Sequence, residues 1–162
     1  MKTAILFILI LITPVICSSQ SKFSSGISSG LIYANKVNGL NENLFIAYKT
    51  SKNIDIGVDA LFGEIKFNNA TFKTNTFLGY IEAGNAEKGF LKNKFYFSAI
   101  IGFGYVEQKI DVSKNSTGTF FAGTKLNYNL RNNCLLGIKS GYYFSNLENV
   151  IIANIFFTYK FE

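Results

Sequence analysis

The chain has 162 residues, enough for one domain, and 48% of them are hydrophobic. It contains no histidine, which excludes both the commonest general base near neutral pH and the commonest metal ligand. Its net charge of +6 fits hydrated surface lysines, and the absence of any cluster of basic and aromatic residues argues against nucleic-acid binding.

The first residues, Met1–Ser19, have the pattern of an export signal. Lys2 supplies the positive charge, an apolar core begins at Ala4, and small residues precede the expected cleavage site. The apolar core is too short for a membrane-spanning helix, which needs about 20 residues. We therefore expect residues 1–19 to be a cleaved signal peptide and residues 20–162 to form the mature domain. An uncleaved N-terminal anchor is the alternative.

The chain has two cysteines, and their positions restrict the possible disulfides. Cys17 leaves with the predicted signal peptide, so Cys134 remains as the single thiol and no intramolecular disulfide can form. A lipoprotein acylated at Cys17 is an alternative, but the bulky Ile16 precedes that residue where such signals want a small one. We expect Cys134 to be a neutral structural thiol.

Eight segments of the mature part are predicted to be β-strands, because their apolar and polar residues alternate with a period of two. In chain order they are Gly26–Ala34, Leu44–Lys49, Ile54–Lys66, Thr76–Gly84, Lys94–Val106, Thr119–Leu130, Cys134–Phe144 and Val150–Glu162. The third segment alternates most cleanly: Ile54, Ile56 and Val58 share one face. Asp55 and Asp59 lie on the other face, where Leu61 is an exception to the polar pattern.

The connections between these segments are predicted to alternate in length. Residues 35–43, 67–75 and 107–117 are polar and are predicted to be exposed loops, whereas residues 50–53 form a short turn. Long loops at one rim and short turns at the other are typical of outer-membrane barrels. The link at residues 85–93 fits this alternation less well. The even number of strands allows the sheet to close without an edge.

The direction of the apolar face decides the class of protein. If it points inward, the chain is a soluble lipocalin-like barrel that binds an apolar ligand; if it points outward, the chain is a membrane barrel. The polar face consists mainly of Gly, Ser, Asn and single charges, which suits the narrow interior of an eight-stranded barrel. The many large apolar residues would overfill that interior. We therefore predict a membrane barrel.

Charged residues on the polar face are then predicted to lie inside the barrel. They are Asp55, Asp59, Glu82, Lys125, Lys139 and Lys160. The third and seventh strands of an eight-stranded ring face each other, so Asp59 and Lys139 are expected to meet, and Glu82 is expected to reach Lys125. Buried charges are costly unless they are paired, which predicts an internal salt-bridge network that plugs the lumen. An ion gate is the alternative.

The closing strand ends in four outward apolar residues, Ile155, Phe157, Tyr159 and Phe161. With the signal peptide and the eight alternating segments, this pattern resembles the small OmpA/OmpX-like family of bacterial outer-membrane barrels. The resemblance implies an all-β, eight-stranded antiparallel up-and-down transmembrane barrel in the outer membrane of a bacterium. It also implies that the four residues are an assembly signal for the barrel-assembly machinery.

The same resemblance implies a function without catalysis or cofactor. We expect a monomer with a structural or surface-interaction role through extracellular loops, in contact with outer-membrane lipid and lipopolysaccharide. Small barrels that act as lipid acylases, deacylases or phospholipases depend, by resemblance, on histidine, and this chain has none. A narrow gated channel and the soluble lipocalin-like barrel are the alternatives.

Overall fold

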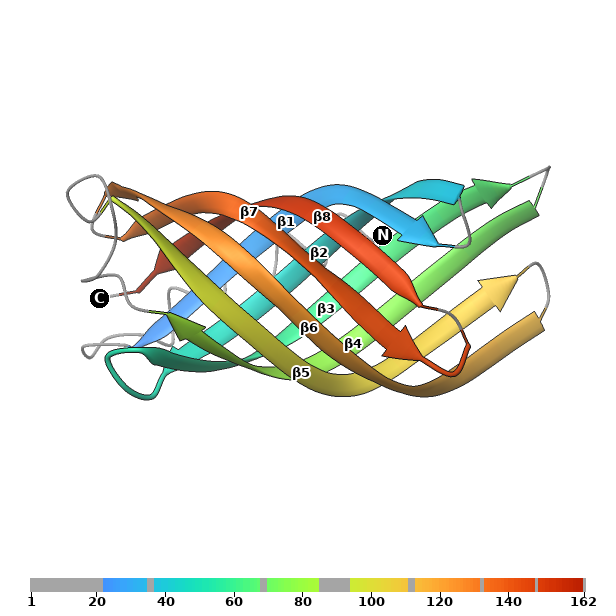
Figure 1. The fold of residues 1–162 in the computed structure, drawn as a ribbon, viewed down its shortest axis with the longest axis horizontal. Helices are drawn as coiled ribbons and strands as arrows, with labels where there is room; N and C mark the ends of the chain where they lie inside the picture. Colours follow the sequence, from blue (N-terminus) through green and yellow to red (C-terminus); the bar gives the residue numbers. More distant parts are fainter. Residues whose placement is uncertain are drawn as a thin grey trace.

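The computed structural model describes residues 22–34, 37–67, 70–84, 94–110, 113–131, 133–147 and 149–161, which form a closed barrel of eight strands (Figure 1). The strands are β1 (Phe23–Ala34), β2 (Val37–Lys49), β3 (Ile54–Phe67), β4 (Ala70–Gly84), β5 (Phe95–Ile110), β6 (Ser113–Arg131), β7 (Cys134–Ser145) and β8 (Val150–Lys160). Within these residues no helix is long and apolar enough to cross a membrane. The predicted signal peptide lies outside the described residues.

Each strand pairs antiparallel with its neighbours in the chain, and β8 pairs antiparallel with β1. That closing ladder runs from Ser24 opposite Lys160 to Tyr33 opposite Ile151. The register between β6 and β7 shifts once, between Asn129 and Arg131. The prediction of an eight-stranded, antiparallel, up-and-down barrel is therefore confirmed.

The two ends of the barrel differ in shape. We call the end where β1 begins and β8 stops the terminal end, and the opposite end the hairpin end. At the hairpin end the β3–β4 and β5–β6 hairpins extend further than the other two, on the right of Figure 1. These two hairpins contain the four longest strands, of 14, 15, 16 and 19 residues.

The three predicted long loops are wrong. Residues 37–43 belong to β2, residues 70–75 to β4, and residues 107–110 and 113–117 to β5 and β6. The second strand is also longer than the predicted Leu44–Lys49, since β2 has 13 residues. The strand ends at the hairpin end are mostly polar, with isolated apolar residues such as Leu40 and Phe72, so they lack the regular alternation by which a strand is recognised in a sequence. The link at residues 85–93 lies outside the described residues.

The apolar faces of the strands point outward. Phe97, Phe103 and Ile155 are 65%, 68% and 65% exposed, whereas the inward Ile100 and Ile152 are 3% and 0% exposed. This arrangement excludes the soluble lipocalin-like alternative, because that barrel would direct its apolar faces inward. The outer surface instead forms a continuous apolar belt around the barrel.

Aromatic rings border this belt at both ends. Phe23 lies 5.0 Å from Tyr48, centroid to centroid, at the terminal end, and Phe62 lies 6.2 Å from Phe77 toward the hairpin end. Beyond the second border the outward positions are polar, as at Lys73 on β4. An apolar band with aromatic girdles is the outer surface of a membrane-spanning barrel.

Candidate functional site

The lumen is the candidate site because it contains most of the buried polar and charged side chains. Along much of its length it is filled by apolar side chains that form one cluster with residues from all eight strands. The least exposed are Ile32, Ile152, Phe121, Phe156 and Leu61, at 0%, 0%, 1%, 1% and 2%. Leu61, which interrupted the predicted polar face, thus lies inside.

Glycines make room for the largest of these rings. A Cβ atom added to Gly123 would lie 2.6 Å from the ring of Phe121, and one added to Gly137 would lie 2.7 Å from the ring of Phe156. Neither glycine could become alanine without displacing a ring. The small residues on the polar face therefore allow large rings into a narrow barrel.

Lys139 on β7 forms an ion pair with Asp59 on β3, across the lumen. Both side chains are 3% exposed. The Lys139 ammonium also lies 5.1 Å from the centroid of the Phe121 ring, in cation–π geometry. The structure thus brings together the two residues that were expected to meet.

A second ion pair joins Lys125 on β6 to Glu82 on β4, with the Lys125 Nζ atom 2.6 Å from Glu82 Oε2. Ser98 donates a hydrogen bond of 2.6 Å to Glu82 Oε1, and Asn127 donates one of 2.9 Å to Ser98 Oγ. The Lys125 ammonium lies 4.7 Å from the centroid of the Phe45 ring. Both oxygens of this carboxylate are therefore hydrogen-bonded.

The two ion pairs are neighbours, because Lys125 and Lys139 are direct cross-strand partners on β6 and β7. Like charges that lie opposite each other destabilise a sheet. Asp59 on β3 and Glu82 on β4 offset this repulsion, since each pairs with one of the two lysines. The four side chains therefore form one electrostatic unit, in which the loss of a carboxylate affects both lysines.

A set of amides beside this unit was missed in the sequence. Asn41 and Asn154 exchange two hydrogen bonds, of 3.0 Å and 2.6 Å, and Asn154 also donates one of 3.1 Å to Ser28. The inward positions of Ser28 and Asn154 follow from the alternation in β1 and β8, whereas Asn41 lies in β2 within residues that were predicted to be a loop. Their mutual contact depends on register, which alternation does not give.

Asp55 and Lys160, the other two predicted lumen charges, lie near the terminal end. Both line a cavity of about 210 Å³ that also reaches Glu82 and Lys125. The structure therefore places four of the six predicted charges in two ion pairs within the lumen and the other two around the cavity at the terminal end.

Neither a protein-family model nor a curated protein matches the sequence, but solved structures do. Neisserial surface protein A superposes with a TM-score of 0.75 and 12% identity, over 87% of this chain and 98% of that protein. Ail, the attachment invasion locus protein of Yersinia pestis, superposes with a TM-score of 0.58 and 14% identity, over 87% and 97%. The outer membrane enzyme PagL superposes with a TM-score of 0.55 and 9% identity, over 83% and 99%.

At these identities the likeness shows the fold. This is the fold of a small outer-membrane β-barrel. The neighbours are bacterial outer-membrane proteins, and the apolar belt of this chain fits a bilayer, so the protein is a barrel of the bacterial outer membrane. Because the neighbours include an enzyme beside a surface protein, the fold does not decide the activity.

The closing strand of this outer-membrane barrel directs the four predicted assembly residues to the belt side of β8 and its end. Ile155, Phe157 and Tyr159 are exposed, and the Tyr159 ring lies 5.1 Å from that of Phe161. Such rings near the terminal end border the lipid. Recognition by the assembly machinery remains a prediction.

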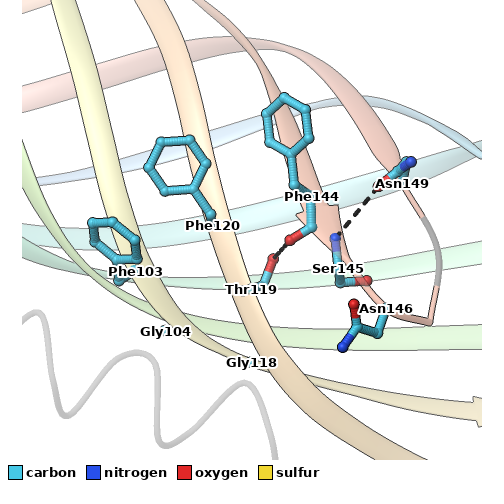
Figure 2. A pocket seen from close by; sticks show the side chains of 9 residues that line it. All are labelled: Phe103, Gly104, Gly118, Thr119, Phe120, Phe144, Ser145, Asn146 and Asn149. Atoms are coloured by element: carbon cyan, nitrogen blue, oxygen red, sulfur yellow. Dashed lines mark hydrogen bonds between the residues drawn. The ribbon is translucent and has the colours of Figure 1, made fainter.

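A second hollow lies on the outer wall of the barrel, beside the β7–β8 turn (Figure 2). It has a volume of about 460 Å³ and is lined by Phe103, Gly104, Gly118, Thr119, Phe120, Phe144, Ser145, Asn146 and Asn149. We call it the wall recess. Thr119 donates a hydrogen bond of 3.1 Å to the Phe144 carbonyl, and Asn149 Oδ1 accepts one of 3.4 Å from the Ser145 backbone.

In the described part of the chain, no three His, Cys, Asp or Glu side chains lie close enough together to hold a metal ion. Cys134, at the start of β7, is partly exposed and is a free thiol.

Proposed function

We propose that this outer-membrane barrel has no enzymatic activity, that side chains plug its lumen against ions, and that its hairpin end serves a structural or surface-interaction role. The observation that carries the proposal is the filled lumen. Ile32, Leu61, Phe121 and Ile152 are each at most 2% exposed and belong to one apolar cluster. An ion that crossed this cluster would lose its hydration without gaining a polar partner, which is the large cost of burying an unpaired charge.

The ion pairs support the same proposal. Lys139–Asp59 and Lys125–Glu82 compensate each other's charges within the lumen. Both oxygens of the Glu82 carboxylate already accept hydrogen bonds, so this carboxylate has little capacity to coordinate a passing cation. We therefore expect the pairs to stabilise the barrel rather than to gate it.

A surface role is supported by the projecting β5–β6 hairpin. The ladder between β6 and β7 begins at Thr119, so residues 113–118 pair with β5 on one side and with no described strand on the other. An unpaired edge is a template for an added strand from a partner protein. Two neighbours are named a surface protein and an attachment invasion protein, and those words describe them alone.

The orientation that suits this role places the hairpin end outside the cell and the two termini in the periplasm. The outward face of the hairpins is polar beyond the aromatic border, with Glu64, Lys73 and Lys114 in ion pairs on the surface. Polar strand ends of this kind extend into water, beyond the acyl chains of the bilayer. Digestion of intact cells should cut this end first.

The remaining expected partners are outer-membrane lipid, lipopolysaccharide and the barrel-assembly machinery, and we propose that the protein is a monomer. The absence of enzymatic activity is supported by the lack of histidine. It is tested by incubating the folded barrel with lipid A and with phospholipid, and analysing the lipids for lost acyl chains.

A narrow gated channel is the second candidate, because the 210 Å³ cavity at the terminal end is lined by charges of both signs. Planar-bilayer recording separates the two. We expect no conductance steps from the wild-type protein or from Lys139→Ala, because the apolar cluster stays in place. Conductance steps in the wild-type protein that change in Lys139→Ala would contradict the plugged barrel and support the gated channel.

A further inference from the structure

The wall recess exists because two neighbouring strands stop at different heights. The last pair between β6 and β7 joins Thr119 to Ser145, and β6 continues for six more residues toward the hairpin end. The β7–β8 turn therefore lies below the free part of β6. The step between them leaves the hollow that Figure 2 shows between the ring of Phe120 and the turn residue Asn146.

The lower wall of the recess is aromatic. The centroid of the Phe120 ring lies 4.8 Å from that of Phe103 and 5.8 Å from that of Phe144. Phe103 and Phe144 are 68% and 46% exposed on the belt. These three rings provide an apolar surface at the border between the bilayer and water, where a lipid acyl chain would enter the headgroup region.

The centre of the recess is open because of Gly118. A Cβ atom added there would meet a single neighbour within 4 Å, the Gly104 carbonyl oxygen at 3.9 Å. A side chain at this position would occupy the hollow. The outward positions on either side of Gly118 along β6 carry Phe120 and Ser116, so the glycine interrupts an otherwise filled face.

The far rim is polar and basic. The exposed amides of Asn146 and Asn149 belong to the β7–β8 turn. Further out on the hairpin, Lys109 and Lys114 are direct cross-strand partners on the outward face. Glu107 lies 2.7 Å from Lys114, and this hydrogen bond raises the pKa of the Lys114 ammonium, which keeps it charged.

From the belt outward, the wall thus offers aromatic rings, an open space, amides, and then two ammonium groups beside the Glu107 carboxylate, which pairs with one of them. The geometry points to a binding site for a phosphorylated glycolipid of the outer leaflet. Its acyl chains lie on the three rings, its sugar fills the space over Gly118 beside the amides, and its phosphate reaches Lys109 and Lys114. This assignment rests on the proposed orientation, with the hairpin end outside the cell.

The test is a titration of the detergent-solubilised, folded barrel, followed by native mass spectrometry. The probes are lipid A, which carries both sugar and phosphate, and phosphatidylglycerol, which is anionic but has no sugar. We expect wild-type protein to bind lipid A more tightly than phosphatidylglycerol. Equal binding of both lipids would overturn the assignment, since any anionic lipid would then suffice.

Gly118→Leu fills the recess and should weaken lipid A binding by about tenfold, the effect of a misplaced group of this size in a shaped site. Ala83→Leu is the control, because Ala83 is also exposed on the outward face but lies near the terminal end of β4, away from the recess. It should leave the affinity unchanged. Equal losses in the two variants, or no loss in Gly118→Leu, would overturn the site.

Asn146→Ala and the pair Lys109→Gln with Lys114→Gln separate the sugar and phosphate contacts. Each should weaken lipid A binding, and the lysine pair should also flatten its salt dependence. Unchanged affinity in both would overturn the assignment. Lipid binding by the solubilised barrel requires neither a sealed lumen nor a particular orientation in the membrane. A negative binding result is therefore distinct from a failure of the proposed function, which is tested by bilayer recording and by digestion of intact cells.

Discussion

Two ion pairs of the same chemistry lie in different surroundings in this barrel. The Lys139–Asp59 pair lies in the lumen with both side chains 3% exposed, and the Lys73–Glu64 pair lies on the projecting β3–β4 hairpin at 57% and 43%. Water can replace a lost partner on the hairpin but not in the lumen. The difference teaches that a lysine–carboxylate pair contributes to the stability of the barrel in the lumen, whereas the same kind of pair on the surface contributes little.

The largest effect is expected when the lumen carboxylate is removed. Asp59→Ala leaves Lys139 buried without its partner and beside Lys125. We expect the free energy of unfolding in lipid vesicles, measured with urea, to fall by about 3–5 kcal/mol. Glu64→Ala on the hairpin is the control and should cost at most about 1 kcal/mol. Similar losses in both variants would mean that the lumen is hydrated.

The next largest effect is expected from a lysine placed on the apolar belt, in comparison with one placed on the projecting β5–β6 hairpin. Val58 is 61% exposed at the centre of the belt, and Ser116 is exposed on the projecting part of β6. Val58→Lys should lower the free energy of unfolding in bilayers by about 2–4 kcal/mol, because the ammonium enters acyl chains. Ser116→Lys should change it by less than about 0.5 kcal/mol. An unchanged free energy of unfolding in Val58→Lys would mean that this position faces water and not lipid.

A smaller effect is expected from two glycines on opposite faces. A Cβ atom on Gly141 would collide with the Phe121 ring, whereas one on Gly79 would point into open space. Gly141→Ala should therefore destabilise the barrel by about 1–3 kcal/mol through crowding. Gly79→Ala should have almost no effect on the urea midpoint. If the order of the two variants were reversed, the assignment of inner and outer faces would be wrong.

The alternation of residues was sufficient to predict the strand count, the two faces and the partners of the lumen charges. Alternation persists only where one face meets lipid and the other meets the lumen. At residues 113–118 both faces are polar, so the strand was predicted to be a loop. Local sequence cannot separate a hydrated strand from a loop when pairing with a neighbour stabilises it.

The contents of the lumen could be predicted only in part. Ile152 and Phe156 alternate with Asn154 on the inward face of β8, yet the sequence does not tell that they fill the lumen together with Phe121. Their contacts depend on the register of eight strands. One signal was available: inward glycines such as Gly137 recur beside large inward rings on neighbouring strands.

The central claim is that apolar side chains on alternate positions face lipid, and two pairs of adjacent isoleucines test it most directly. Ile101 and Ile151 are 50% and 44% exposed, while Ile100 and Ile152 are 3% and 0% exposed. In lipid nanodiscs with methyl-labelled isoleucine, acyl-chain protons should give nuclear Overhauser effects to Ile101 and Ile151 and none to Ile100 and Ile152. Effects to Ile100 and Ile152 alone would contradict the account.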